Sequence, residues 1–328
     1  MHYILLKSLQ NPFRLKKPTL QPNDVCCTSA IAITAKLTLL FTSLAIGLCC
    51  FQSQAIAESI GDVFTREGKP PRRTLLQWSY GTSFSGGPDL SKPLVTDRPD
   101  FTEASSTVGR RVLQIESGYT YFYNNDGGSR LISHSYPEAL FRYGILADWL
   151  ELRFASNLGT QQSNTIRESG AQDLYLGLKL GLTPQEGVLP EMALVPQMTV
   201  PTGDSAFTSG KTLPGLNWLY GWDVNDTLTT AGSTQYNKRL DGQTSETYTE
   251  WAQSWTIGYS LADKLGAYTE WFALFPSSAD TEKPQYYFDG GFTYQFTDNV
   301  QWDIRAGVGL NEAADDYFIG SGLSIRRW

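Results

Sequence analysis

The residues best suited to chemistry lie in one short segment, Thr-Asp-Arg-Pro-Asp-Phe-Thr-Glu, at positions 96–103. Three carboxylates, Asp97, Asp100 and Glu103, and one guanidinium, Arg98, stand close together there. Such groups form charge-assisted hydrogen bonds with an oppositely charged surface, and Asp residues near Pro also cap simple turns. Which of these uses applies depends on the elements that bring other charged residues near the segment.

A catalytic interpretation lacks a well-placed base. Histidine is the usual base at neutral pH, and His134 is the one histidine in the sequence from position 58 onward. Ser133 and Ser135 flank His134, but neighbouring side chains of an extended chain point to opposite faces. We therefore expect His134 to be a solvated residue in or beside a loop at 125–135, and we predict no catalytic residue, no cofactor and no metal site. The enzymatic alternative, a barrel that acts on lipid, would need a nucleophile paired with His134.

The remaining charged residues follow a pattern that predicts the fold. From position 112 onward, runs of roughly ten residues alternate apolar with polar or small side chains and then reach a turn. In one run, Leu150 and Leu152 alternate with Glu151 and Arg153. An Arg or Lys facing lipid at the bilayer midplane costs roughly 2–4 kcal/mol, so the charged face must line a lumen. The predicted lumen-lining residues are Glu116, Arg142, Glu151, Arg153, Lys179, Glu270, Asp303 and Arg305.

The number of runs and the lengths of their connections favour an outer-membrane barrel. Strands are expected near 112–124, 136–144, 149–158, 171–182, 189–201, 214–224, 227–238, 246–261, 264–275, 285–297, 299–310 and 316–327. Tight turns alternate with longer polar loops at 125–135, 159–170, 202–213, 239–245 and 276–284. Outer-membrane barrels have even strand numbers and short periplasmic turns. The predicted fold class is all-β, an antiparallel transmembrane β-barrel of about 12 strands with both termini periplasmic. The strands of a soluble sandwich or propeller would also alternate apolar and polar residues, so such a fold is the competing interpretation.

The N-terminal region, positions 1–57, has the order of an export signal. Basic residues from Lys7 to Lys36 precede a short apolar stretch at 37–51, and a small-x-small triplet follows at 55–57. The stretch is shorter than the roughly 20 residues of a membrane-spanning helix. There are two alternatives: an uncleaved inner-membrane anchor, or a lipoprotein signal that ends at Cys49 or Cys50. We predict a signal peptide at 1–57, a periplasmic linker or partial plug at 58–111 and the barrel at 112–328.

Cleavage of this signal would change the composition of the chain. All four cysteines lie within positions 1–57, so the mature chain would contain no disulfide. Lys plus Arg would fall from 26 to 21 and Asp plus Glu from 33 to 32, which takes the net charge from −7 to −11. An acidic product binds nucleic acid poorly, so nucleic acid is not an expected partner. The expected partners are outer-membrane lipids, the outer-membrane assembly machinery and a small-molecule solute.

Several short motifs occur in an order that resembles a known family. They are the 96–103 segment, Leu-Gln-Ile-Glu-Ser-Gly-Tyr at 113–119, Arg-Tyr-Gly at 142–144, Leu-Glu-Leu-Arg at 150–153, Asp-Leu-Tyr-Leu-Gly-Leu-Lys at 173–179 and Pro-Thr-Gly at 201–203. Over residues 95–328 the chain resembles the phenol MetA degradation family of outer-membrane transporters, named for the meta-cleavage pathway of phenol degradation. The resemblance implies a secreted outer-membrane barrel that passes small hydrophobic or aromatic molecules. It brings no catalytic residue to this chain.

The leading functional hypothesis is an outer-membrane channel or facilitator with a narrow interior. Twelve strands enclose a lumen between those of filled small barrels and open porins. A closed barrel with a structural or surface-binding role is the alternative. We hypothesise that Asp97, Asp100 or Glu103 pairs with Arg142 or Arg153 and tucks the pre-barrel segment into the periplasmic mouth as a partial plug. A purely structural network of lumen charges is the competing interpretation.

Overall fold

The computed structural model of the chain describes residues 90–327 except residue 127. Strands, turns and extended loops make up this described part. Within it, none of the chain forms a helix of the length and apolarity that crossing a membrane requires. The predicted signal peptide at 1–57 and the predicted linker up to residue 89 lie outside the described residues.

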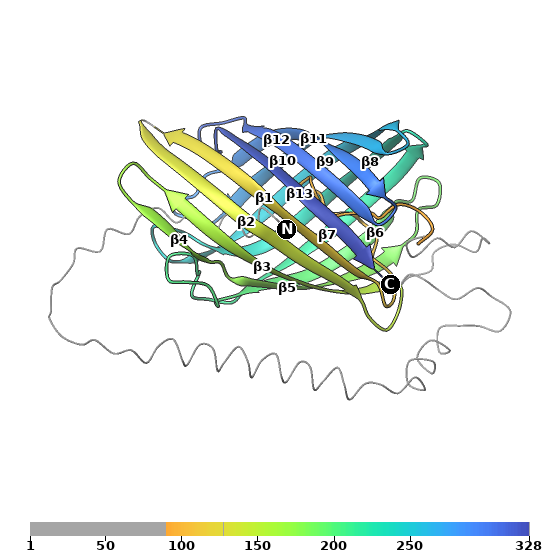
Figure 1. Cartoon of the computed structure of the whole chain (residues 1–328). Helices are drawn as coiled ribbons and strands as arrows, with labels where there is room; N and C mark the ends of the chain where they lie inside the picture. The colour runs from red at the N-terminus through yellow and green to blue at the C-terminus, as the bar shows by residue number, and fades with distance from the viewer. Residues whose placement is uncertain (1–89, 127, 328) are drawn as a thin grey trace. The chain divides into compact units, whose positions relative to one another are not determined.

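Twelve strands form a closed antiparallel barrel (Figure 1). Consecutive strands of the ring are neighbours, and β1 pairs with β13 to close it. The short β4 stands outside the ring, because it pairs only with the last residues of β3. The strands are β1 (Leu113–Asp126), β2 (Ser129–Gly144), β3 (Leu150–Gln162), β4 (Arg167–Ala171), β5 (Leu174–Thr183), β6 (Glu191–Val200), β7 (Leu213–Asn225), β8 (Leu228–Leu240), β9 (Thr247–Ala262), β10 (Leu265–Ser277), β11 (Gln285–Thr297), β12 (Val300–Gly309) and β13 (Tyr317–Arg327).

Alternation along each strand separates an apolar outer surface from a polar interior. On β10, Trp271 is exposed on the outside, whereas its neighbours Glu270 and Phe272 are buried inside. The same holds on β12, where Trp302 is exposed and Asp303 is buried. Successive side chains of a strand point to opposite faces, so one register turns the large apolar residues of these strands outward. The barrel therefore offers apolar side chains to membrane lipids, as the fold prediction requires.

The first long loop of the sequence prediction is wrong. The region 125–135 is mostly strand, because β1 continues to Asp126 and β2 begins at Ser129. Asn124 pairs with Leu131 and Asn125 with Arg130, in register with the rest of the hairpin. Asn, Gly and Ser disfavour strands only weakly, and pairing with a neighbouring strand outweighs that preference. The loop predicted at 159–170 is also largely strand, because β3 continues to Gln162 and the unpredicted β4 pairs with its last residues. The predicted strands otherwise agree with the observed ones to within a few residues.

His134 consequently lies in a strand, and the expectation of a solvated loop histidine is wrong. Its ring lies on the outer face of β2, where Nδ1 is 2.7 Å from the hydroxyl oxygen of Tyr119. The ring of Tyr121 packs edge-on against it, with centroids 5.5 Å apart. Ser133 and Ser135 are buried on the opposite face of the strand. The strand geometry therefore separates both serines from the histidine.

Candidate functional site in the barrel interior

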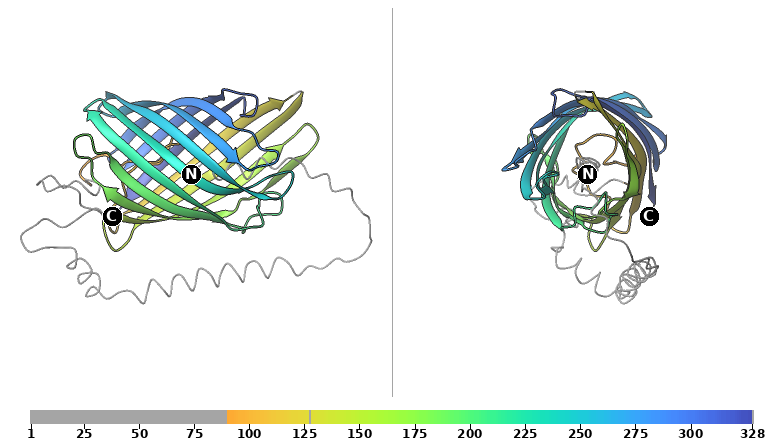
Figure 2. Two further views of the ribbon diagram at one scale, coloured as in Figure 1. Left: turned by 180° about the vertical axis from the view of Figure 1, so that it is seen from behind. Right: turned by 90° about the vertical axis from the view of Figure 1, so that its left-hand side faces the viewer.

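Residues 94–109, which precede β1, lie inside the barrel and are called here the inner segment. In the end-on view of Figure 2, the orange chain of this segment lies within the ring of strands. Leu94, Phe101 and Val108 are each less than a tenth exposed, although they belong to no strand. The backbone N–H of Leu94 donates to the carbonyl of Asp298 in the turn between β11 and β12, at 2.8 Å. The segment therefore occupies space that the strands alone would leave open.

Asp97 anchors the inner segment to three cations of the wall. Its carboxylate lies 3.2 Å from Arg142 of β2, 2.7 Å from Arg153 of β3 and 2.9 Å from Lys179 of β5. Its backbone N–H donates to Glu116 of β1, at 3.0 Å. Burial opposes ionisation of Asp97, but the three cations outweigh burial and lower the pKa of its carboxyl group. The side chain is thus a buried anion that is compensated by its neighbours.

A second acid, Glu103, extends this anchor along the segment. Its carboxylate lies 3.1 Å from Arg153. On the wall, Glu151 accepts from Arg142 Nε at 2.8 Å and from the backbone N–H of Val108 at 2.9 Å. Charged side chains of the wall therefore hold both the side chains and the backbone of the inner segment. Burial of these charges is tolerated because each lies close to an opposite charge.

Arg98 is clamped across the seam between the first and last strands. Its guanidinium donates to Glu138 of β2 at 2.6 Å and to Asp303 of β12 at 3.1 Å. Gly118 of β1 pairs with Gly322 of β13, and a Cβ on either glycine would collide with this guanidinium. The two glycines thus form a notch in which Arg98 lies flat against the wall.

The middle of the segment, residues 99–102, meets a group of acids. Glu270 of β10 accepts from the backbone N–H groups of Phe101 and Thr102, at 2.6 and 2.8 Å. Arg305 of β12 donates to the carbonyl of Pro99 at 2.7 Å. Asp100 faces acids instead of cations. Burial, and then Glu270 and Asp289, raise the pKa of the Asp100 carboxyl group well above its usual range.

Aromatic rings fill the adjoining part of the lumen. Phe101 of the inner segment stacks on Phe272 of β10 with centroids 4.5 Å apart and planes 3° from parallel. Phe272 stacks in turn on Tyr287 of β11, at 4.7 Å and 14°. Two loop residues, Phe207 and Ala314, belong to the same buried cluster. The wall, the segment and the long loops thus jointly build an apolar layer inside the barrel.

All eight residues predicted to line the lumen face the interior and are less than a tenth exposed: Glu116, Arg142, Glu151, Arg153, Lys179, Glu270, Asp303 and Arg305. All eight contact the inner segment directly. Of the hypothesised pairs, the structure places Asp97 beside both arginines and Glu103 beside Arg153, but places Asp100 among acids. The sequence analysis did not identify Glu138 as a lumen residue. Glu138 lies four residues before Arg142 on β2, so the alternation of faces could have assigned it to the lumen. The described residues contain no group of acids, histidines and cysteines arranged to hold a metal ion.

Comparisons with known proteins agree with the motifs of the sequence. The family model described as "Putative MetA-pathway of phenol degradation" matches residues 96–326, which include most of the inner segment and every strand of the ring. No curated protein matches the chain. Solved structures with a similar outline include the NanC porin, with 13% identity and a TM-score of 0.42, covering 65% of this chain and 98% of that one. Another is the translocator domain of the autotransporter NalP from Neisseria meningitidis, with 12% identity and a TM-score of 0.44, covering 67% and 88%.

Proposed function

This chain belongs to the phenol MetA degradation family, and we propose that it is an outer-membrane channel or facilitator for small, uncharged or aromatic molecules. Its barrel is closed, its outer surface is apolar, and its interior combines polar groups with stacked rings. Side chains just fill the interior of a barrel of about eight strands, and a barrel of 12 strands encloses more space than that. The proposed location is the outer membrane, with a cleaved signal peptide, both termini in the periplasm and delivery by the outer-membrane assembly machinery.

The observation that carries the proposal is the ring stack inside the lumen. Phe101, Phe272 and Tyr287 stack nearly parallel to one another in the interior, where contact with lipid cannot account for their presence. Offset-stacked aromatic pairs contribute about 0.5–1.5 kcal/mol beyond the area that they bury. A planar solute that displaced Phe101 would recover much of this stacking energy against Phe272. The layer therefore favours passage of flat apolar molecules over hydrated ions.

The inner segment is proposed to act as a partial plug. Its ion pairs with β2, β3 and β5 fix one side of it, and the ring of Phe101 closes the aromatic layer. Removing one partner of a buried ion pair typically costs about 3–5 kcal/mol, so thermal motion alone rarely undocks the segment. The resting barrel would therefore conduct ions poorly, and solute contact with Phe101 would open it.

Reconstitution into liposomes tests this function. We expect purified protein to speed entry of a small uncharged aromatic such as benzamide while passing little current. Phe272→Leu should slow that entry severalfold and leave swelling in small sugars unchanged, because the substitution removes a stacking surface and keeps the side chain apolar. Phe292→Leu, an aromatic exposed on the outer face, is the matched control. Liposomes that neither conduct nor take up either solute would reject the channel.

A closed barrel with a structural or surface-binding role is the second candidate, and one observation favours it. The loops at 241–246 and 278–284 are tied together by Asp241, which accepts from the backbone N–H of Thr281 at 2.9 Å and from its hydroxyl at 2.7 Å. Such cross-links make a firm outer layer. If this role is correct, deletion of residues 278–283 alters the phenotype and lumen substitutions do not. A lipid-acting enzyme is less favoured, because His134 lies across the strand from both neighbouring serines; loss of hydrolysis in His134→Ala would support it.

A further inference from the structure

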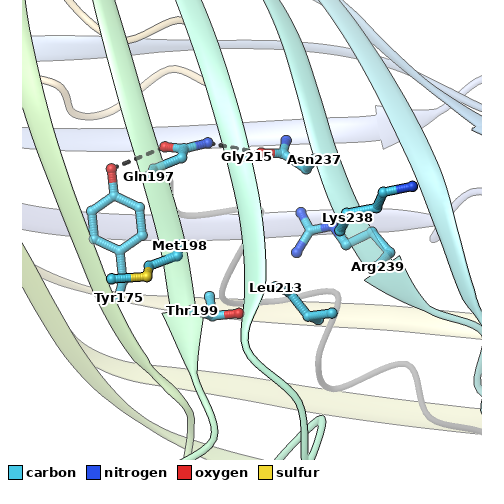
Figure 3. A pocket seen from close by; sticks show the side chains of 9 residues that line it. All are labelled: Tyr175, Gln197, Met198, Thr199, Leu213, Gly215, Asn237, Lys238 and Arg239. Carbon is cyan, nitrogen blue, oxygen red and sulfur yellow. Dashed lines mark hydrogen bonds between the residues drawn. The ribbon is translucent and has the colours of Figure 1, made fainter.

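Beginning on β5 beside the ion pairs and running to β9, the wall carries a continuous chain of uncharged hydrogen bonds. The hydroxyl of Tyr175 donates to Gln197 at 3.0 Å, and Gln197 Nε2 donates to Asn237 at 2.9 Å (Figure 3). Asn237 Nδ2 donates to Gln235 at 3.2 Å, and the chain continues through serines of β8 and β9 to Thr102 of the inner segment. Amide side chains therefore connect β6 and β8 across the lumen face of β7.

Asn217 of β7 lies in the middle of this wall and is left out of the chain. It pairs in register with Val195 on one side and with Gln235 on the other. Its side chain is completely buried, yet neither its Nδ2 nor its Oδ1 has a hydrogen-bond partner among the described residues. A buried amide without partners costs about 1–3 kcal/mol for each unmet group. A molecule that supplies both a donor and an acceptor there would recover that energy.

A small pocket lies on the same wall, nearer the long loops than Asn217, and Asn217 itself does not line it. Gln197, Thr199, Leu213, Asn237 and Arg239 line it from the lumen side (Figure 3). Gly215 makes the pocket possible, because a Cβ at this position would collide with Oδ1 of Asn237. Asn217 is the next residue on the same face of β7. The pocket and the unpartnered amide thus share one strand of the wall.

The lumen-facing cations near this wall are already paired with acids. Arg239 donates to Glu250 of β9 at 3.1 Å, and Lys179 lies against Asp97. Lys238, which also lines the pocket but alternates with the buried Asn237 and Arg239, donates to the hydroxyl of Thr249 at 2.8 Å. An anionic solute would meet the carbonyl oxygens of the amides, and a cationic one would find Glu250 already paired. An uncharged hydroxyl matches the wall best, since it donates to Oδ1 and accepts from Nδ2 of one amide.

We propose that Asn217, with Gln197 and Asn237, forms a binding site for uncharged, hydroxyl-bearing solutes. The site rests on the proposed channel function only for its role in passage, because binding itself needs no transport. Solutes would follow the amide wall, where hydrogen bonds are exchanged one for another, and would avoid the ion pairs that hold the inner segment. The aromatic layer beside Thr102 then meets the apolar part of the same solute.

Direct binding to the full chain folded in detergent tests the site without any transport step. Arabinose is the uncharged probe and arabinonate its carboxylate counterpart, each titrated by saturation-transfer NMR. We expect a saturable arabinose signal in the wild type and a weaker signal with arabinonate. Asn217→Leu should raise the arabinose Kd about tenfold, the result of losing two net hydrogen bonds.

Gln161→Leu is the matched control, because Gln161 is a buried amide of the lumen face that lies on β3, away from β6 to β8. It should leave the Kd within about twofold. Heat-modifiable gel mobility shows whether each variant is folded. If Asn217→Leu does not fold, Asn217→Ser is measured in its place, and its Kd should lie between those expected for the wild type and for Asn217→Leu. Equal Kd values in wild type and both Asn217 variants would overturn the site, as would the lack of a saturable wild-type signal. Binding in detergent without any entry of solute into liposomes would keep the site and reject the channel.

Discussion

The two walls of the lumen differ in how they use polar groups. The charged wall, formed by Glu116, Glu138, Arg142, Glu151, Arg153 and Asp303 of β1–β3 and β12, binds the chain's own inner segment. The amide wall, formed by Gln197, Asn217, Gln235 and Asn237 of β6–β8, binds mostly itself and leaves one amide unmet. Separating the partners of an ion pair in a desolvated interior costs much free energy, whereas neutral hydrogen bonds are exchanged at a small cost. Charge thus holds the inner segment in place, whereas the neutral wall is where we propose that a solute binds.

The largest effect is expected on the charged wall. Asp97→Ala leaves Arg142, Arg153 and Lys179 facing one another without their shared anion, so the folded protein should lose about 3–5 kcal/mol of stability. Denaturant titration of the detergent-folded protein measures this loss. The inner segment should also become sensitive to protease, and single-channel current should rise as it undocks.

The amide wall supplies the control for this prediction. Gln235→Ala removes a neutral link of the hydrogen-bond chain and should cost only about 1 kcal/mol, with the inner segment still protected from protease. Equal losses in the two variants would show that the walls do not differ energetically, and the division of roles would fail.

An intermediate effect is expected at the notch that receives Arg98. Gly118→Ala places a methyl group where the guanidinium lies, so overpacking should cost about 1–3 kcal/mol and weaken docking of the segment. Gly181→Ala is the matched control, because a Cβ at Gly181 of β5 would meet its nearest neighbour, Trp149, at an ordinary 3.6 Å. Thermal unfolding of both variants decides the matter. A control that is as damaging as Gly118→Ala would remove the special place of Arg98.

The smallest effect concerns pH. The pKa of Asp100 is raised in the folded protein by burial and by Glu270 and Asp289. Its contribution to stability is therefore fully present below the unfolded pKa of about 3.9 and is lost as pH rises through the folded value. Asp100→Asn, which stays neutral, should be more stable than the wild type at pH 8 and equal to it at pH 3. Measured difference curves that run the opposite way would mean that Asp100 lies beside cations instead of acids.

Alternation predicted the barrel because it reports directly on what lipid excludes. Leu150 and Leu152 against Glu151 and Arg153 assign the two faces of β3 with no knowledge of the neighbouring strands. The same logic placed all eight charged residues inside. It also led to the hypothesis that Asp97, Asp100 or Glu103 would reach Arg142 or Arg153, because these acids were expected to enter from the end of the barrel where the arginines lie. Asp97 and Glu103 do so, and Asp100 does not.

Contacts between residues far apart in the chain could not be predicted from the sequence pattern. Strand partners, not local composition, make 125–135 a hairpin, so a stretch rich in Asn, Gly and Ser looked like a loop. Asp100 was grouped with the other acids, although its neighbours are Glu270 and Asp289, which belong to β10 and β11 near the other end of the chain. Asn217 carries no sequence signal, since an unmet amide is recognised only once every neighbour is placed.

The clamp around Arg98 has a consequence for assembly. Its partners, Glu138 and Asp303, belong to the second strand of the ring and the last but one, and its glycine notch is formed by β1 and β13 together. The complete receptor does not exist before the two ends of the sheet meet. The contacts of Arg98 therefore form only after β1 and β13 have paired, so they stabilise the closed barrel and not the open sheet. A nascent barrel that lacks it must rely on the β1–β13 ladder alone to finish folding.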